Sequence, residues 1–416
     1  MDIISHAVLP YLLGSFFRID RKLLAAFVIG GVAPDLDVFI IWLALIFPSP
    51  DLLLVHRGIT HSPIFGFLIA LAAMLLISRP PGRDIFRRWT GIEFSLSWPV
   101  AALALAGVLM HLFLDYIITK GVPLLYPLDT VRFSAELLFH YEITIPVCSV
   151  GIALWLLRGF FEKKSVSRKT NNKLLALFLI VLLAAGGLRV EGKERALALD
   201  NYGDIAEDLE GDFEVFPDWG LFQWNILNKN ESSFQVYSYD FLNNKTSYLA
   251  SYPRLHVELD AGDPESTSDL NFGDFLKEDR YLKASMSRDE VSDLEETLHL
   301  ADSHPKVVLF RWRACAVAIN ASRNNGSWSL EYYDPVGRAG MVNAPIWMRE
   351  RVKQSSSMKV RVEGDQAYVI GQDLKDLYNL NGERYIEQSD IRLLPALLLS
   401  NDTERILGVT FRALTL

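Results

Sequence analysis

The sequence predicts an α-helical polytopic membrane domain followed by a β-rich extramembrane domain, of either α+β or β-sandwich-like form. Half of the 416 residues are hydrophobic and the mean hydropathy is +0.18, which is high for a soluble chain. Basic and acidic residues number 16 and 12 over residues 1–188, a net charge of +4, but 25 and 38 over residues 189–416, a net charge of −13. Long apolar runs occur only in the first part. We therefore expect two domains, residues 1–190 and 191–416.

Six apolar runs in the first domain approach the ~20 residues that a helix needs to cross a bilayer. They cover residues 4–17, 23–47, 62–78, 99–119, 137–157 and 173–188. The first run is short, so the sequence leaves open whether it spans fully. The second contains Asp35 and Asp37, each of which costs about 2.5–3.5 kcal/mol at the centre of a membrane helix. This run therefore needs a buried, polar-lined setting.

Basic residues cluster in alternate loops between these runs. The three clusters are Arg18/Arg21/Lys22, Arg79/Arg83/Arg87/Arg88 and Arg158/Lys163/Lys164/Arg168/Lys169/Lys173. The positive-inside rule places all three in the cytoplasm. The sequence thus predicts a multi-pass protein of the cytoplasmic (inner) membrane with an extracytoplasmic C-terminal domain. The bilayer is the predicted partner, with a lipid-linked substrate as a further one. No basic nucleic-acid patch is present, and the sequence does not identify a protein partner.

The second domain contains short runs with the alternation and the β-branched or aromatic residues that are typical of strands. They are Phe234–Tyr239, Leu255–Leu259, Val307–Ile319, Trp328–Tyr333, Lys359–Val362, Ala367–Ile370 and Ile406–Leu416. Residues 260–305 are acidic, and we expect a loop there followed by a helix over Arg288–Leu300.

Histidines and aspartates gather near the ends of the membrane runs. They are His6, Asp35, Asp37, His56, His61, His111 and Asp115. His111 and Asp115 are four residues apart, which puts both side chains on one face of a helix. Imidazole and carboxylate groups at that spacing can share a metal ion. A plain His–Asp hydrogen bond between packed helices is the structural alternative.

Two further stretches carry candidate site residues. In His56-Arg57-Gly58-Ile59-Thr60-His61, two histidines flank a glycine and can converge on one ion, and Arg57 suits an anionic group such as phosphate. In Gly30-Gly31-Val32-Ala33-Pro34-Asp35-Leu36-Asp37, the helix is broken and both carboxylates can reach one site. The structural alternatives are a polar interface loop and a kink with hydrogen-bonded aspartates.

These residues resemble the motifs of the YdjM-like family of predicted membrane-bound, metal-dependent hydrolases. The matching pieces are Ser5-His6, Gly31 to Asp37, His56 to Ser62, and His111 to Asp115 followed by Thr119, Gly121 and Pro127. The resemblance covers roughly residues 1–190. It implies metal-dependent hydrolysis in the membrane, with the histidines and aspartates of these motifs as ligands. His140 and Glu142 are further candidates without a distinctive motif.

We therefore predict a hydrolase with one or two divalent ions, zinc being favoured by mixed imidazole and carboxylate ligands. The proposed metal ligands are the seven histidines and aspartates, and the catalytic candidates are Asp35, Asp37 and Arg57. Asp35 or Asp37 would bridge ions or act as the base. A lipid or lipid-linked phosphoester is the expected substrate, because the site lies at membrane depth beside Arg57.

Two other function classes stay open at this point. Intramembrane carboxylates and a broken helix also mark the ion pathways of transporters, although six runs without a repeat disfavour this class. The chain could also be a scaffold whose exported domain binds partners after the membrane part has lost activity. Retention of every motif residue disfavours such a loss.

Overall fold

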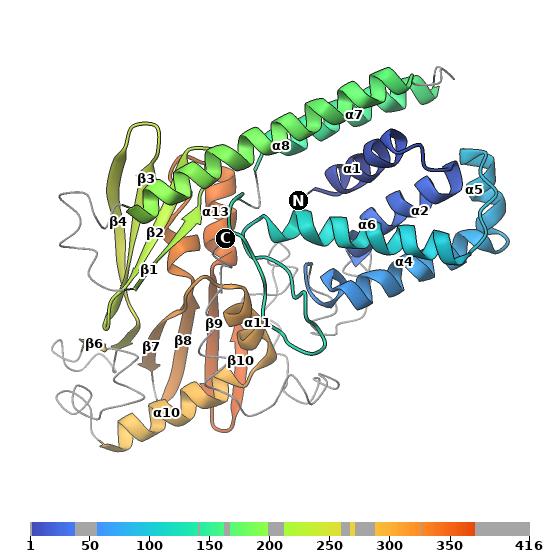
Figure 1. Ribbon diagram of the computed structural model, residues 1–416. Coiled ribbons are helices and arrows are strands. Elements are labelled where there is room, and N and C mark those ends of the chain that lie inside the picture. Colours follow the sequence, from blue (N-terminus) through green and yellow to red (C-terminus); the bar gives the residue numbers. More distant parts are fainter. Residues whose placement is uncertain are drawn as a thin grey trace. The chain divides into compact units, whose positions relative to one another are not determined.

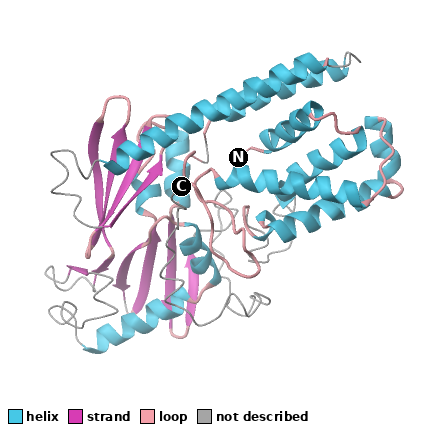
Figure 2. Cartoon of the chain, in the orientation of Figure 1, coloured by secondary structure: helices cyan, strands magenta, loops and turns pink. Residues whose placement is uncertain are grey.

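The computed structural model describes residues 2–37, 56–139, 142–161, 167–198, 212–258, 267–270, 288–324 and 326–370. The chain forms two compact units that divide between Glu191 and Gly192. Figure 2 shows that helices make up the N-terminal region and that the strands lie in the C-terminal region. The predicted order, a helical part followed by a β-sheet-rich part, is confirmed.

Helices follow one another through the first unit. They are α1 (Ile3–Phe16), α2 (Arg21–Val32), the 3-10 turns η1 (Ala33–Leu36) and η3 (Ile59–His61), α4 (Pro63–Ser78), α5 (Gly82–Thr90), α6 (Trp98–Tyr116), α7 (Thr144–Phe161) and α8 (Arg168–Leu197). Side-chain caps set several starts: Asp2 accepts from the backbone N–H of Ile4 and Ser5, and Ser62 caps α4 ahead of Pro63. Such caps satisfy N–H groups that the first turn leaves without partners.

Two of the described helices, α6 and α8, are long and apolar enough to cross a membrane. The pair α4 and α5 passes the same test together but bends by 86° between its members, and α1 and Thr144–Gly159 are shorter apolar helices. Helix α2 occupies the start of the predicted run 23–47, whose part after Asp37 lies outside the described residues. The apolar helices are therefore present, and the number of crossings stays a prediction.

The second unit contains two sheets. The first is an antiparallel meander in the order β1 (Asp212–Pro217), β2 (Gln223–Lys229), β3 (Ser233–Asp240) and β4 (Lys245–Pro253). The second has the order β10 (Gln366–Ile370), β9 (Ser357–Glu363), β8 (Ser327–Tyr333), β7 (Ala318–Asn324), β5 (Leu255–Glu258) and β6 (Thr267–Leu270). Its pairs are antiparallel except β5 with β7.

Helices α10 (Arg288–Asp302) and α11 (Pro305–Arg313) supply apolar side chains to one core of the six-stranded sheet. Leu294, Leu298 and Phe310 lie there against Leu330 and Val360. The short helices α12 (Pro335–Ala339) and α13 (Ile346–Ser355) follow β8. Helices on a sheet of this kind correspond to the α+β form of the prediction.

One predicted strand is wrong. Residues 307–313 of the expected run Val307–Ile319 form α11, and β7 begins only at Ala318. The helix starts because His304 caps Lys306 and Pro305 occupies the first turn, where proline is favoured. Val307 and Phe310, three residues apart, then share its buried face. The other expected runs match β3, β5, β8, β9, β10 and α10, apart from Ile406–Leu416, which lies outside the described residues.

Candidate metal centre

The seven predicted ligands come from segments far apart in the chain. His6 lies on the second turn of α1, Asp35 in η1, His61 at the end of η3, and His111 and Asp115 on the last turns of α6. Figure 1 shows α1, α2, α4 and α6 side by side. The 3-10 turns η1 and η3 join this bundle where α2 ends and α4 begins, so all five residues can reach one place.

Glycines allow α1, α2 and α6 to approach closely. A Cβ atom on Gly30 would lie 2.0 Å from the carbonyl oxygen of Ala104, and one on Gly107 would lie 2.2 Å from that of Phe27. A Cβ atom on Gly31 would lie 2.5 Å from the carbonyl oxygen of His6. Small residues at helix contacts are typical of membrane bundles. Here they bring His6 and His111 into ring stacking, with centroids 3.7 Å apart.

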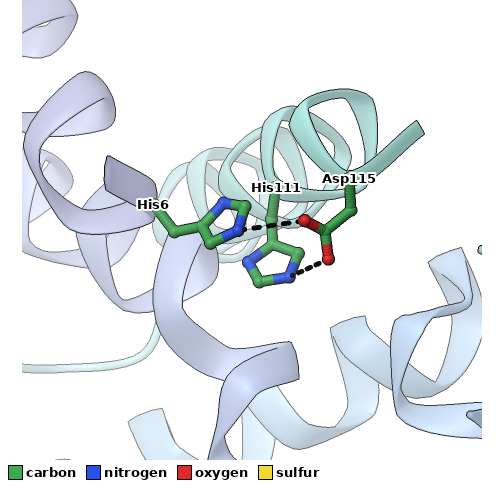
Figure 3. A group of neighbouring side chains, drawn as sticks. All are labelled: His6, His111 and Asp115. Atoms are coloured by element: carbon green, nitrogen blue, oxygen red, sulfur yellow. Dashed lines mark ion pairs between the residues drawn. The ribbon is translucent and has the colours of Figure 1, made fainter. Parts of the chain in front are cut away.

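Five side chains form what we call the inner group: His6, Asp35, His61, His111 and Asp115. The distances below are measured from the Nε2 atoms of the histidines to the carboxylate oxygens of the aspartates. The Nε2 atom of His6 lies 3.4 Å from Asp115 Oδ1, and that of His111 lies 3.7 Å from Asp115 Oδ2, as Figure 3 shows. The Nε2 atom of His61 lies 3.4 Å from Asp35 and 3.6 Å from Asp115.

Burial of the inner group is nearly complete. All three histidine side chains are fully enclosed, and those of Asp35 and Asp115 are 5% and 1% exposed. Among the described residues, the Nε2 atoms of His6, His61 and His111 and both carboxylate oxygens of Asp35 have no hydrogen-bond partner. Buried polar atoms without partners cost about 1–3 kcal/mol each. Several such atoms close to one another are therefore the arrangement expected of metal ligands.

The distances also fit a shared ion better than direct hydrogen bonds. Bond lengths of about 2.0–2.1 Å place tetrahedral zinc ligands roughly 3.3–3.4 Å apart. The separations of 3.4–3.7 Å in the inner group lie close to this value and beyond the usual length of a nitrogen–oxygen hydrogen bond. Two groups of side chains could thus hold a metal ion: His6 with His111 and Asp115, and Asp35 with His56 and His61.

Outer contacts set the orientation of two histidines. His111 Nδ1 lies 2.7 Å from the Gly31 carbonyl oxygen, so Nδ1 donates and Nε2 keeps its lone pair for the inner group. His61 Nδ1 lies 3.0 Å from Thr60 Oγ1, whose hydroxyl is 2.9 Å from Asp37 Oδ2. Thr60 therefore accepts from His61 and donates to Asp37. Such outer partners fix the tautomer and raise the basicity of a ligand.

Asp37 and His56, which we call the rim pair, lie on the Nδ1 side of His61. His56 Nδ1 is 3.1 Å from Asp37 Oδ1, and the His56 side chain is 38% exposed. Asp37 itself is fully buried. His56 also forms a group with Asp35 and His61 whose ligand atoms all lie within 4.8 Å of one another. Asp35 is therefore adjacent to both groups of potential ligands.

Arg57 has a positive φ of 63° and is 8% exposed. Its Nε atom lies 3.3 Å from Asp115 Oδ2, and its Nη1 atom lies 3.5 Å from the Thr119 carbonyl oxygen. Asp115 is thus the carboxylate of the inner group that the guanidinium contacts. This contact places a buried positive charge against a potential metal ligand.

Two sequence candidates remain, His140 and Glu142. His140 is outside the described residues. Glu142 forms a 3.1 Å ion pair with Arg189 of α8, and neither group of potential ligands includes it. Sequence reasoning missed Thr60 and the Gly31 carbonyl. Both residues belong to the quoted motifs. Neither a threonine beside a histidine nor a backbone carbonyl has a sequence pattern that would identify it as a contact of the site.

Comparisons with known proteins give a consistent result. The model of the YdjM inner membrane protein family matches residues 1–193. The chain is 30% identical to inner membrane protein YbcI of Escherichia coli (strain K12) over 138 residues, which are 32% of this chain and 71% of the relative. No solved structure gives a significant match. Both matches fall short of the whole chain, and the family match ends near the start of the second unit.

Proposed function

Because this chain belongs to the YdjM inner membrane protein family, we propose that residues 1–190 are a multi-pass membrane domain that hydrolyses a phosphoester with a divalent metal ion. One observation carries the proposal: three imidazole nitrogens that lack hydrogen-bond partners in the described part of the chain converge with two carboxylates in a buried space. Ionisable groups at membrane depth are expensive and mark functional sites.

The donor set favours zinc. Imidazole with carboxylate ligation is typical of catalytic zinc sites, which use about three protein ligands and leave a position for water. His6, His111 and Asp115 would be one such set of three, with His61 3.6 Å from Asp115 and Asp35 3.7 Å from His111 as neighbouring donors. When bound, such an ion lowers the pKa of a water molecule towards ~7 and polarises the bond to be broken.

The rim pair suits proton transfer. Asp37 holds His56 at 3.1 Å, and His56 is the most exposed of the seven predicted ligands. A carboxylate behind an imidazole orients the ring and stabilises its protonated form. We assign His56 with Asp37 to accept the proton from the attacking water and pass it to solvent. A second ion beside Asp35, His56 and His61 would replace this role, and the metal stoichiometry distinguishes the two cases.

Arg57 indicates an anionic substrate. A guanidinium binds phosphate through a planar fork of N–H donors, and it stabilises charge that develops on the phosphoryl oxygens. Arg57 Nε faces Asp115, and Nη1 faces the Thr119 carbonyl. We propose that the guanidinium links the metal ligands to the substrate phosphate. Because the site lies among apolar helices, the substrate class is a lipid or lipid-linked phosphoester.

Arg57→Lys tests this assignment. The variant keeps the charge but loses the planar fork, so we expect it to retain folding and metal while hydrolysis falls by at least tenfold. The assay screens lipid phosphoesters with purified protein in detergent, before and after metal removal by a chelator and readdition. Hydrolysis in wild type that survives complete metal removal, or full activity in Arg57→Lys, contradicts the proposal.

We further propose that the metal centre faces outward and that the C-terminal domain is extracytoplasmic. Within the first unit, the inner group lies at one end of the helices. The basic turn between α1 and α2 and the basic helix α5 lie at the other end. The distance along α6 from Trp98 to His111, thirteen residues, is about 20 Å. The positive-inside rule places the basic end in the cytoplasm, which leaves the inner group in the outward half.

A further inference from the structure

Helix α5 has two chemically distinct faces and buries little of either. Its apolar side chains Ile85, Phe86 and Trp89 fall within one third of the helical circumference, while Arg83, Arg87 and Arg88 lie on the opposite side. Ile85 and Trp89 are 58% and 71% exposed. Phe86 packs on Phe94, with ring centroids 5.8 Å apart, and it anchors the helix to the bundle.

Helix α5 follows the apolar helix α4, which the proposed topology places in the bilayer. Leu75 and Leu76 near the end of α4 are 42% and 72% exposed, as expected of side chains that face lipid. Arg79-Pro80-Pro81 follows, and α5 then departs at 86° from α4. A helix perpendicular to a membrane-crossing one lies parallel to the membrane plane. Gly91, with a φ of 71°, ends it through an N–H bond to the Arg87 carbonyl.

Charge at this end of the bundle is positive. Residues 79–93 contain four arginines against Asp84 and Glu93. Lys22 at the start of α2 donates to Ser95 Oγ, so the basic α1–α2 turn lies beside the connection that follows α5. Exposed aromatic residues surround this end: Phe17, Trp89 and Trp98. Aromatic side chains next to arginines are typical of the boundary between lipid and water.

We propose that α5 is an interfacial helix that binds the anionic headgroups of phospholipids in the cytoplasmic leaflet. Ile85 and Trp89 insert among the acyl chains, and Arg83, Arg87 and Arg88 contact the phosphates. A protein partner would also cover apolar side chains, but it would not account for arginines opposite them at the end of a lipid-facing helix. The proposal concerns a surface separate from the metal centre and goes beyond the proposed hydrolysis.

Lipid titration of the full chain tests the charged face. Purified protein in detergent is titrated with phosphatidylglycerol or phosphatidylcholine and analysed by native mass spectrometry. We expect wild type to prefer phosphatidylglycerol. Each arginine near an anionic surface raises the binding affinity roughly fivefold. The triple variant Arg83→Gln/Arg87→Gln/Arg88→Gln should therefore bind phosphatidylglycerol more weakly, on the order of 100-fold. Binding of phosphatidylcholine should be unchanged.

A matched control removes the same charge elsewhere. Lys353→Gln/Lys359→Gln/Arg361→Gln alters three basic residues of the second unit and should keep the preference of wild type. Equal affinity of wild type for the two lipids, or an equal loss in both triple variants, overturns the proposal.

Depth measurement tests the apolar face. A chain with Cys148→Ser, Cys315→Ser and Trp89→Cys is labelled with a fluorophore and reconstituted into bilayers that contain a quencher near the headgroup or at the acyl-chain end. We expect the shallow quencher to act more strongly. Fluorescence that neither quencher reduces places α5 in water, or under a protein, and rejects the interfacial helix.

Discussion

At the scale of single residues, His61 is the most constrained member of the centre. Its Nε2 faces Asp35 and Asp115, while its Nδ1 is tied through the Thr60 hydroxyl to Asp37. The sequence predicted the motif residues as metal ligands, and that role stays a prediction. Their division into inner group and rim pair could not be predicted, because that division depends on which ring nitrogen faces which carboxylate.

Asp37→Asn tests whether Asp37 binds the metal itself or only orients the ligand His61. The substituted amide would keep most of the shape but lose the charge behind Thr60 and His61, so we expect metal affinity to fall about 10- to 100-fold. Asp35→Asn should reduce affinity further, because Asp35 belongs to the inner group. Competition with a chromophoric zinc chelator measures both. If the two variants lose equal affinity, Asp37 is itself a ligand.

At the scale of elements, the contact between α2 and α6 positions the inner group. Gly30 and Gly107 permit backbone contact there, and His111 reaches the Gly31 carbonyl across it. The apolar runs predicted α1, α4 and α6 closely, but α7 begins seven residues into the run 137–157 and no run predicted α5. The β-strands were predicted less completely: β2 is buried over five consecutive residues and lacks alternation, and β4 has no buried residue.

Gly107→Ala should disturb the centre from a distance. Its Cβ would lie 2.2 Å from the Phe27 carbonyl oxygen, so α2 and α6 must separate and the inner group must widen. We expect a loss of bound metal and a lower unfolding temperature in detergent. Gly151→Ala on α7 is the matched control, because no atom of a described residue lies within 4 Å of its Cβ. Unchanged metal content in Gly107→Ala would show that close helix packing does not position the ligands.

At the scale of the whole molecule, two units with different chemistry share one chain. The first has exposed apolar helices and a buried cluster of ionisable groups, and the second has two sheets with ordinary apolar cores. The charge difference between the halves predicted two environments, and which environment each unit occupies stays a prediction. The positions of the candidate ligands in space required the fold, because they come from α1, η1, η3 and α6.

Orientation in the membrane is tested by cysteine labelling. In a chain with Cys148→Ser and Cys315→Ser, we expect an impermeant maleimide to reach Asn230→Cys from outside the inner membrane. Lys164→Cys, in the third basic cluster of the sequence, should react only after lysis. The basis is the alternation of three basic clusters. Labelling of position 164 in intact cells would reverse the proposed orientation.

Metal content of the purified full chain tests the central claim most directly. Inductively coupled plasma mass spectrometry should find at least one equivalent of a divalent ion, predominantly zinc, in wild type. His61→Ala and His111→Ala should lose most of it, while His256→Ala and His299→Ala in the second unit should retain it. Absence of a divalent ion from wild type, or equal metal in all four variants, would contradict a metal centre at the inner group.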